Sequence, residues 1–212
     1  MKRLLINIVL LCVVCGIYAQ STIYTYNGKC KIEIPNKLEL QHSELHSVKH
    51  INAQNQKKQV QVSTKSGHIT FQQLGLNAQT KTAQNQYCRV ILEYFPASKQ
   101  SPVYQRGERI IVDYDLITLI GEIAKDQCKQ SKTSLLKFFN IEATTINGYP
   151  TIYYSFRRQG WEGRPPVIVN VFWIYNKYEN VILTFSYRES ERATWINIMD
   201  YLLKSFKFTK NY

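Results

Sequence analysis

The sequence lacks the short motifs by which many common enzymes are recognised. It contains no Gly-x-Ser-x-Gly segment, no His-Glu-x-x-His segment and no glycine-rich loop of the kind that surrounds a phosphate. These absences argue against the familiar serine hydrolases, zinc peptidases and nucleotide-binding proteins, and they imply no cofactor. A hydrolase whose site is assembled from residues far apart in the chain stays open. No Asn-x-Ser/Thr segment occurs either, so the chain offers no acceptor for N-glycosylation.

Acidic residues are also scarce. The chain has 15 Asp and Glu against 27 Lys and Arg, which gives a formal net charge of +12 at pH 7. Such an excess favours an anionic surface or partner, although solubility alone also explains it. The lysines are scattered and form no long basic run.

The first 19 residues have the organisation of a secretory signal peptide. Lys2 and Arg3 form a basic start, an apolar run extends from Leu4 to Ile17, and the chain turns polar after Ala19. The run is shorter than the roughly 20 apolar residues that a membrane-spanning helix needs. We therefore predict cleavage after Ala19 and a periplasmic or secreted mature protein without a membrane span. Outside the cytoplasm we expect no nucleic-acid partner.

Cleavage would remove two of the five cysteines and leave Cys30, Cys88 and Cys128. An odd number leaves at least one thiol free or paired between chains. The spacing fits no metal or redox motif, so the three residues form one disulfide or none. Cysteines without a partner are expected to be buried as small apolar residues.

Alternating apolar and polar residues predict a series of strands within a single domain over residues 20–212. The clearest are, by residue number, 30–34, 86–95, 141–146, 149–158, 167–175 and 180–187. Asn147 and Gly148 supply the two positive φ angles of a type I′ turn, so the strands on either side of them are expected to pair as a hairpin.

Two helices are expected beside these strands. Apolar residues at three- and four-residue steps predict a helix over 113–129, with Asp113 and Asp115 at its start. A second amphipathic helix follows Ser190, which is expected to be its N-cap. An antiparallel run of strands followed by a packed helix indicates the α+β class, here a central antiparallel sheet packed between helices.

Two segments show weaker patterns. Residues 20–29 are interpreted as a polar lead-in. Residues 41–66 are rich in Gln, Lys, His and Ser, so an irregular segment with a weak strand at 59–62 is predicted there.

The C-terminal part of the chain resembles the superfamily of PsbP-like, DcrB-like and Ran-binding Mog proteins. The resemblance covers residues 141–208, and more faintly 30–35. It is carried by the segments NGYPTIYYSFRR, VIVNVFWIY, ENVILTFSYRES and WINIMDYLLKSFKF, with Ser205 and Phe206 at the end of the last helix. It implies an α/β/α sandwich, in which an antiparallel sheet lies between helical layers. It also implies a binding or accessory role without a catalytic signature.

One loop between two predicted strands carries the best candidate ligand site. Arg157, Arg158, Trp161 and Arg164 surround it. A surface tryptophan ringed by arginines can stack on a sugar or base while the arginines hold a phosphate or carboxylate. Alternatively, the tryptophan folds back on the sheet edge and the arginines are solvated.

A second candidate is a series of histidines, His42, His46 and His50, spaced by four residues. On a helix they would share one face and could bind zinc, nickel or copper. On a strand, successive members would lie about 13 Å apart, too far for one metal ion. The alternative is a polar surface segment.

Together these features predict an exported, non-enzymatic binding or accessory protein of the bacterial cell envelope. Its partner would be an unidentified protein or an anionic envelope polymer. A metal-binding envelope protein and a hydrolase with a non-local site are the alternatives.

Overall fold

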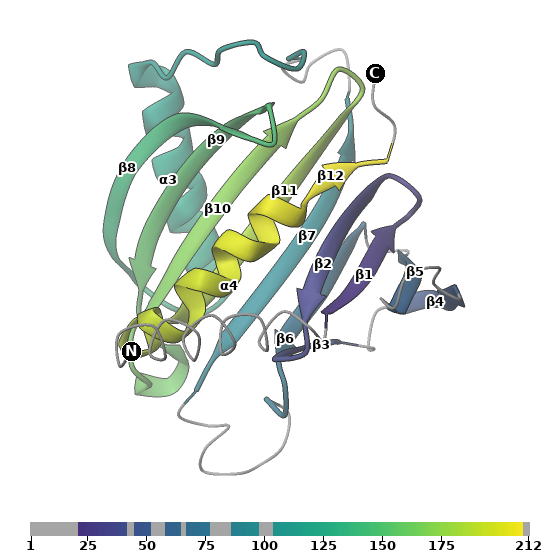
Figure 1. The fold of residues 1–212 in the computed structure, drawn as a ribbon. Helices are drawn as coiled ribbons and strands as arrows, with labels where there is room; N and C mark the ends of the chain where they lie inside the picture. Colours follow the sequence, from purple (N-terminus) through teal and green to yellow (C-terminus); the bar gives the residue numbers. More distant parts are fainter. Residues whose placement is uncertain are drawn as a thin grey trace, which may run out of the picture.

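The computed structural model describes residues 21–41, 45–51, 58–64, 67–76, 86–97 and 104–209. The predicted signal segment lies outside them. Within the described residues the chain forms an α+β fold dominated by strands, with one sheet of seven strands and one of five (Figure 1). No helix in this part of the chain combines the length and apolarity that a membrane crossing requires.

The seven-stranded sheet is antiparallel throughout. Its strands are, in spatial order, β3 (Leu38–Leu40), β6 (His68–Gln73), β7 (Cys88–Pro96), β11 (Glu179–Arg188), β10 (Val167–Tyr175), β9 (Tyr149–Arg158) and β8 (Leu135–Ile146). The strands predicted near residues 86–95 and from 141 to 187 are thereby confirmed, and they form adjacent members of one sheet.

The five-stranded sheet contains one parallel pair, β1 with β5. Its strands are, in spatial order, β12 (Lys207–Phe208), β2 (Cys30–Pro35), β1 (Ser21–Tyr26), β5 (Lys58–Thr64) and β4 (Leu45–Ile51). Two short 3₁₀ helices, η1 (Trp161–Gly163) and η2 (Glu189–Glu191), and two longer helices, α3 (Tyr114–Gln130) and α4 (Arg192–Ser205), complete the described structure.

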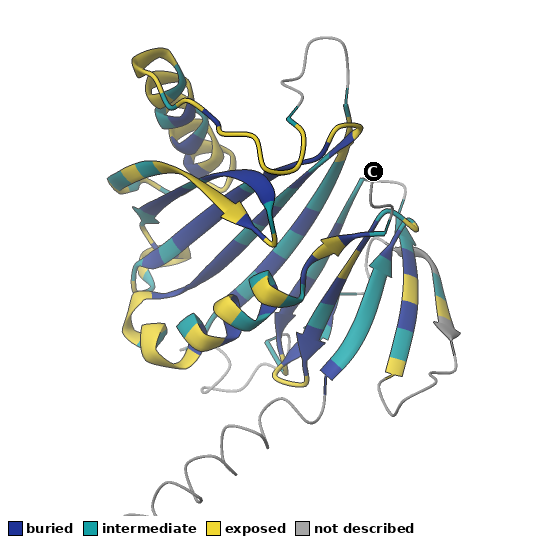
Figure 2. Ribbon diagram, turned by 45° about the horizontal axis from the view of Figure 1, so that its top comes forward, coloured by how far each residue is buried: buried dark blue, intermediate teal, exposed yellow. Residues whose placement is uncertain are grey.

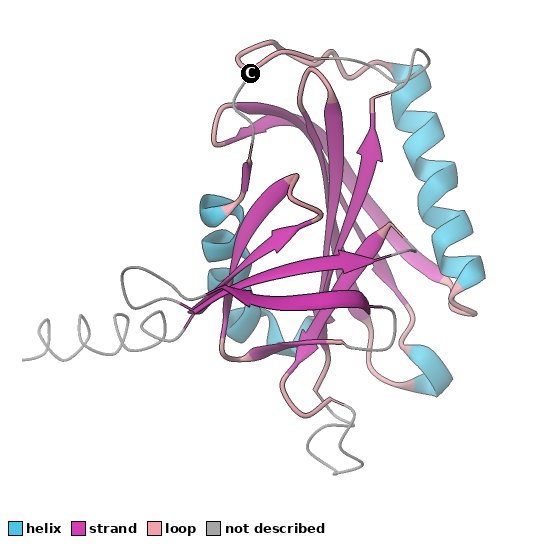
Figure 3. Cartoon of the chain, turned by 90° about the vertical axis from the view of Figure 1, so that its right-hand side faces the viewer, coloured by secondary structure: helices cyan, strands magenta, loops and turns pink. Residues whose placement is uncertain are grey.

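The two longer helices cover opposite faces of the large sheet (Figure 3). On β11, Val181, Leu183 and Phe185 point to the face of α4, as their alternation predicts, whereas Ile182 packs on the face of α3. Both faces are apolar at β10 and β11, so these two strands are buried from two sides.

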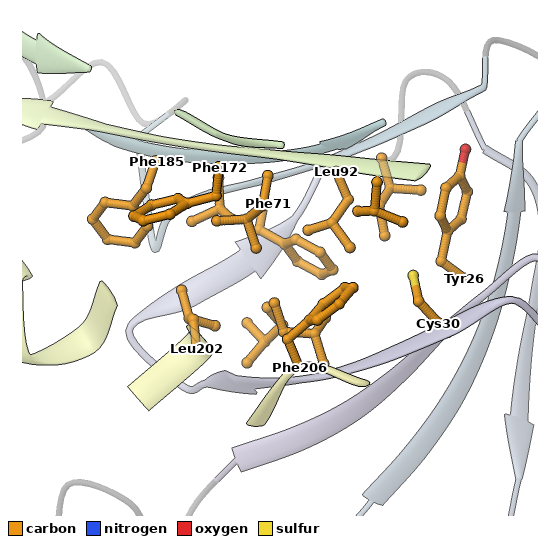
Figure 4. Packing of buried hydrophobic residues seen from close by; sticks show 14 of the residues in the cluster. Tyr26, Cys30, Phe71, Leu92, Phe172, Phe185, Leu202 and Phe206 are labelled. Atoms are coloured by element: carbon orange, nitrogen blue, oxygen red, sulfur yellow. The ribbon is translucent and has the colours of Figure 1, made fainter. Parts of the chain in front are cut away.

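The predicted sandwich of helix, sheet and helix describes this fold only in part. The small sheet shares the face of α4 and buries Tyr26, Ile32, Val60 and Val62 against the large sheet. Figure 4 shows Leu202 and Phe206 facing residues of the large sheet across this core. A second sheet therefore covers area that we expected a helix to cover.

β2 confirms the strand predicted at 30–34, whereas β1, β4 and β5 of the small sheet come from the segments with the weakest sequence patterns. Residues 21–26 form β1, and Asn27 and Gly28, with φ angles of 46° and 66°, begin the turn to β2. Residues 45–51 and 58–64 form β4 and β5, and the weak strand expected at 59–62 lies inside β5. β5 carries few apolar residues because Val60 and Val62 supply its buried positions.

The Asn147–Gly148 turn has the predicted geometry, with φ angles of 52° and 83°. Its asparagine also has a role that the sequence does not indicate. The Asn147 side-chain amide donates hydrogen bonds to the carbonyl oxygens of Leu203, at 3.0 Å, Lys204 and Phe206. Carbonyls at a helix C-terminus have no partners within the helix. The turn between β8 and β9 therefore caps α4.

The residues after this cap join α4 to the small sheet. The backbone N–H of Glu33 on β2 donates to the Ser205 hydroxyl at 3.0 Å. Phe206 is fully buried, and Phe208 on β12 packs edge-on against Tyr149 with the ring centroids 4.9 Å apart. The Ser-Phe pair thus covers the outer edge of β2 and fills the core beneath it.

The helix starts agree in part with the expectation. Asp113 caps α3 by accepting from the Leu116 N–H at 2.9 Å. The predicted N-cap Ser190 instead lies inside η2, and α4 begins after Glu191. The Glu191 carboxylate accepts from the Tyr87 N–H at 3.1 Å, so it anchors a neighbouring segment.

We predict that Asn147→Gly lowers the free energy of unfolding by about 1–2 kcal/mol, because it keeps the positive φ but removes the amide that caps α4. The matched control is Asn27→Gly, since Asn27 also has a positive φ angle but caps no helix. Urea denaturation of the two variants measures the difference. If Asn147→Gly and Asn27→Gly lower the free energy of unfolding equally, the Asn147 amide contributes no stability beyond the conformation of its turn.

The three described cysteines are free and buried. Burial raises the pKa of each thiol above its ordinary value. We expect a thiol reagent at pH 8 to label none of Cys30, Cys88 and Cys128 in the folded protein and all three in denaturant. Mass spectrometry counts the labels, and rapid native labelling of any of the three would contradict the buried arrangement.

Candidate functional site

A row of paired residues crosses one end of the large sheet. Val167 at the start of β10 lies between Arg158, the last residue of β9, and Arg188, the last residue of β11. The Arg188 N–H donates to the Tyr87 carbonyl at 3.0 Å, which extends the row toward β7. Directly paired residues share a sheet face, and Val167 is buried on the face of α3. The register therefore brings two arginines and a tyrosine together.

Three guanidinium groups surround the Tyr87 ring. The Cζ atoms of Arg188, Arg89 and Arg158 lie 5.6, 5.7 and 6.0 Å from the ring centroid. Each distance is within the range of a cation–π interaction. The four residues Arg89, Arg158, Arg188 and Arg164, the last of which follows η1, are called the arginine cluster below.

Arg188 is the buried member of the arginine cluster. It is only 3% exposed, and its Nη1 donates to the Pro165 carbonyl at 2.6 Å. The Nε atoms of Arg188 and Arg89 are buried and have no hydrogen-bond partner among the described residues. Burial lowers the pKa of Arg188, and the charges of Arg164 and Arg158 lower it further. The site therefore holds positive charge that the surrounding protein does not balance.

Acidic residues lie beside the cluster in the chain, namely Glu162 in η1 and Glu189 directly after Arg188. Glu191 raises the pKa of Arg188, so its carboxylate partly offsets the cluster. Among the described residues, none of the four arginines of the cluster forms an ion pair. Arg157, by contrast, pairs with Glu189 at 2.8 Å.

The connection between β9 and β10 presents Trp161 at the surface. The side chain is 52% exposed, and the Arg164 Cζ lies 5.8 Å from its ring centroid. A Cβ at buried Gly160 would lie 2.2 Å from the Arg164 carbonyl oxygen, so only glycine fits this fold of the loop. The loop therefore folds back closely on its own backbone at Gly160, and the indole ring of Trp161 is exposed on its surface.

The structure separates the four residues that the sequence grouped. Arg158, Trp161 and Arg164 belong to the arginine cluster and its loop, whereas Arg157 points to the opposite face of β9. Adjacent residues of a strand must point to opposite faces. Arg157 instead forms its ion pair with Glu189 at the end of a groove.

Three residues of the site, Arg188, Arg89 and Tyr87, were not predicted from the sequence. Arg188 could have been found, because a hairpin that turns at residues 176–178 places it opposite Val167. Arg89 and Tyr87 could not, since they arrive through the pairing of β7 with β11, which are far apart in the chain.

The groove lies between α4 and the outer strands β8 and β9, where β8 is largely exposed (Figure 2). Its volume is about 630 Å³, and a smaller hollow of about 310 Å³ shares Glu142 and Tyr153 with it. The charged residues along both are Lys137, Glu142, Glu189, Arg192, Asp200 and Lys204. Because the two signs balance, the groove lacks the charge excess of the arginine cluster.

The histidine series is placed only in part. His42 lies outside the described residues, and His46 and His50 belong to β4. Residues 45–51 form a strand, so the helical spacing that would favour a shared metal ion is absent there. Within the described residues, no three His, Cys, Asp or Glu side chains gather as a metal site would require. The metal hypothesis stays a prediction.

No protein-family model and no curated protein matches this chain. Several solved structures are similar to it. One is the cyanobacterial PsbP (CyanoP) of Synechocystis sp. PCC 6803, with 12% identity and a TM-score of 0.48 over 90% of this chain and 93% of that one. A PsbP protein is thus among the similar structures, in agreement with the resemblance expected from residues 141–208.

Two further structures are similar. LpqN, involved in cell envelope biogenesis of Mycobacterium tuberculosis, shows 10% identity and a TM-score of 0.48 over 90% of this chain and 91% of LpqN. PA94 of Pseudomonas aeruginosa, a protein of unknown function, shows 10% identity and a TM-score of 0.41 over 88% of this chain and 95% of PA94. At these identities and TM-scores, the similarities say nothing about what this chain does.

We predict that Arg188→Met raises the free energy of unfolding by about 1 kcal/mol, because removing a buried cation beside Arg158 and Arg164 outweighs the loss of its hydrogen bond to the Pro165 carbonyl. The matched control is the exposed Arg192→Met, which is expected to change it by no more than about 0.5 kcal/mol. Urea denaturation measures both. A loss of about 2 kcal/mol or more in Arg188→Met would mean that the arginine stabilises the fold.

Proposed function

We propose that this chain is an exported, non-enzymatic binding protein that holds an anionic partner at the arginine cluster. The observation that carries the proposal is the buried Arg188, whose Nε has no partner among the described residues and which lies near Arg158 and Arg164. Burying a cation without compensation is costly, so a site of this kind gains most from an anion supplied by a partner.

The predicted export segment gives the proposal its location. A mature protein released after Ala19 would meet the proteins and anionic polymers of the cell envelope. A role in envelope biogenesis is stated for LpqN. At 10% identity that role is compatible with the proposal and adds no weight to it.

The thiol of Cys128 interacts with the arginine cluster but is not expected to act as a nucleophile. Cys128 interacts electrostatically with Arg158, which lowers its pKa, but burial has the larger effect and raises it. A protonated thiol is a poor nucleophile. The cluster therefore places positive charge beside a group that stays unreactive.

A fluorescence titration tests the proposal, because Trp161 is exposed whereas Trp195 is buried. We expect poly-glutamate and dextran sulfate each to change the emission of the purified protein at low ionic strength. The change should be lost in Trp161→Phe. Arg164→Gln should weaken binding about tenfold, the equivalent of one lost charge-assisted hydrogen bond.

The matched control is Arg157→Gln, which removes the same charge from the other face of β9. It is expected to bind both polymers with the affinity of the unmodified protein. Equal weakening in Arg157→Gln and Arg164→Gln would show that the chain attracts polyanions through its net charge alone, and it would overturn the proposed site.

A further inference from the structure

We propose that the group held by the arginine cluster is a phosphate, and that Trp161 contacts the ring or sugar attached to it. This inference rests on the proposed function and narrows its ligand from anions in general to phosphate esters. Three features of the cluster lead to it: its charge, the direction of its donors and its neighbouring aromatic surface.

The charge of the cluster exceeds what a carboxylate can balance. Four guanidinium groups gather there. The carboxylate of Glu191 is close enough to raise the pKa of Arg188. A carboxylate brings a single negative charge, whereas a phosphate monoester carries about −1.5 to −2 at pH 7. A phosphate monoester therefore neutralises more of the positive charge of the cluster than a carboxylate does.

The donors come from several directions. Arg89 belongs to β7, Arg158 to β9 and Arg188 to β11, while Arg164 follows η1 with its guanidinium over Trp161. A planar carboxylate accepts a bidentate pair within one plane. A phosphate has three acceptor oxygens arranged in a tetrahedron, so it can accept from guanidinium groups on separate strands.

The presence of arginine rather than lysine in the cluster also favours a phosphate. The sequence has 18 lysines and 9 arginines, yet all four cations of the cluster are arginine. A guanidinium offers a rigid fork that matches phosphate oxygens and also stacks on an aromatic ring, whereas an ammonium is a compact point charge. Three of these guanidinium groups lie within cation–π distance of the Tyr87 ring.

Trp161 adds a surface for the rest of the ligand. Arg164 lies over its ring and also influences the pKa of Arg188, so it links the exposed indole to the buried cation. A sugar or planar ring placed on the indole would carry its phosphate toward Arg164. The site therefore fits a phosphate ester better than a free inorganic ion.

The test is a calorimetric titration with small anions at constant ionic strength. We expect inorganic pyrophosphate and glucose 1-phosphate to bind at least about tenfold more tightly than citrate, which carries comparable charge on carboxylates. Arg164→Gln and Arg158→Gln should each weaken both phosphates about tenfold, and Arg157→Gln should change neither. Trp161→Ala should weaken glucose 1-phosphate more than pyrophosphate, because pyrophosphate has no ring.

A second arm separates a soluble ester from a lipid headgroup. It uses phosphatidylcholine vesicles made equally anionic with either phosphatidic acid, which carries a phosphate monoester, or oleic acid. Binding to the phosphatidic acid vesicles alone, lost in Arg164→Gln and kept in Arg157→Gln, would identify the phosphate as one presented by a membrane. Equal binding to both kinds of vesicle would count against phosphate.

The outcomes also separate this inference from the proposed function. If citrate, poly-glutamate and pyrophosphate bind alike and all depend on Arg164, the anion site stands and the preference for phosphate is overturned. If no anion binding depends on Arg164, both proposals fail. A phosphate preference that survives in Arg164→Gln and Arg158→Gln but not in Arg157→Gln would move the site to the other face of the sheet.

Discussion

The side-chain amide of Asn147 is the contact that fixes the end of α4 against the large sheet. It lies in the turn of the hairpin between β8 and β9, and it caps α4 by donating to carbonyls at the helix C-terminus. Once α4 is held there, Ser205 meets the edge of β2 and Phe206 enters the core between the sheets. A single turn residue thus joins the large sheet, the helix and the small sheet.

The arginine cluster follows from the regularity of that large sheet. Continuous pairing of β9, β10 and β11 ends with Arg158, Val167 and Arg188 in one row, and β7 brings Arg89 beside them. Such a concentration of like charge lowers stability, and partial burial increases its cost. The two apolar faces of the sheet supply the stability that this end of the molecule does not. The groove beside α4, with its balanced charges, shows that the excess is local.

Strong local signals in the sequence predicted most of the large sheet. The Asn147–Gly148 turn, the alternation on β11 and the periodicity of α3 are each consistent with the final structure, because tertiary contacts reinforce them. The small sheet was predicted only in part, at β2 and weakly at β5. Its strand β1 was interpreted as a polar lead-in, because β1 pairs in parallel with β5, which is distant in the chain. For the site, strand alternation alone would have separated Arg157 from Arg158. The presence of Arg89 needed the non-local pairing of β7 with β11.

The claim that the cluster binds an anion is tested most directly at the arginine side chains themselves. Nitrogen-15 NMR of the arginine Nε–H groups, recorded while inorganic pyrophosphate is added, reports each guanidinium separately. The account predicts that the Arg188, Arg158 and Arg164 signals shift together along one saturable curve, while the Arg157 signal stays constant. Constant signals from Arg188 and its neighbours, with shifts at Arg157 and Arg192 instead, would contradict it.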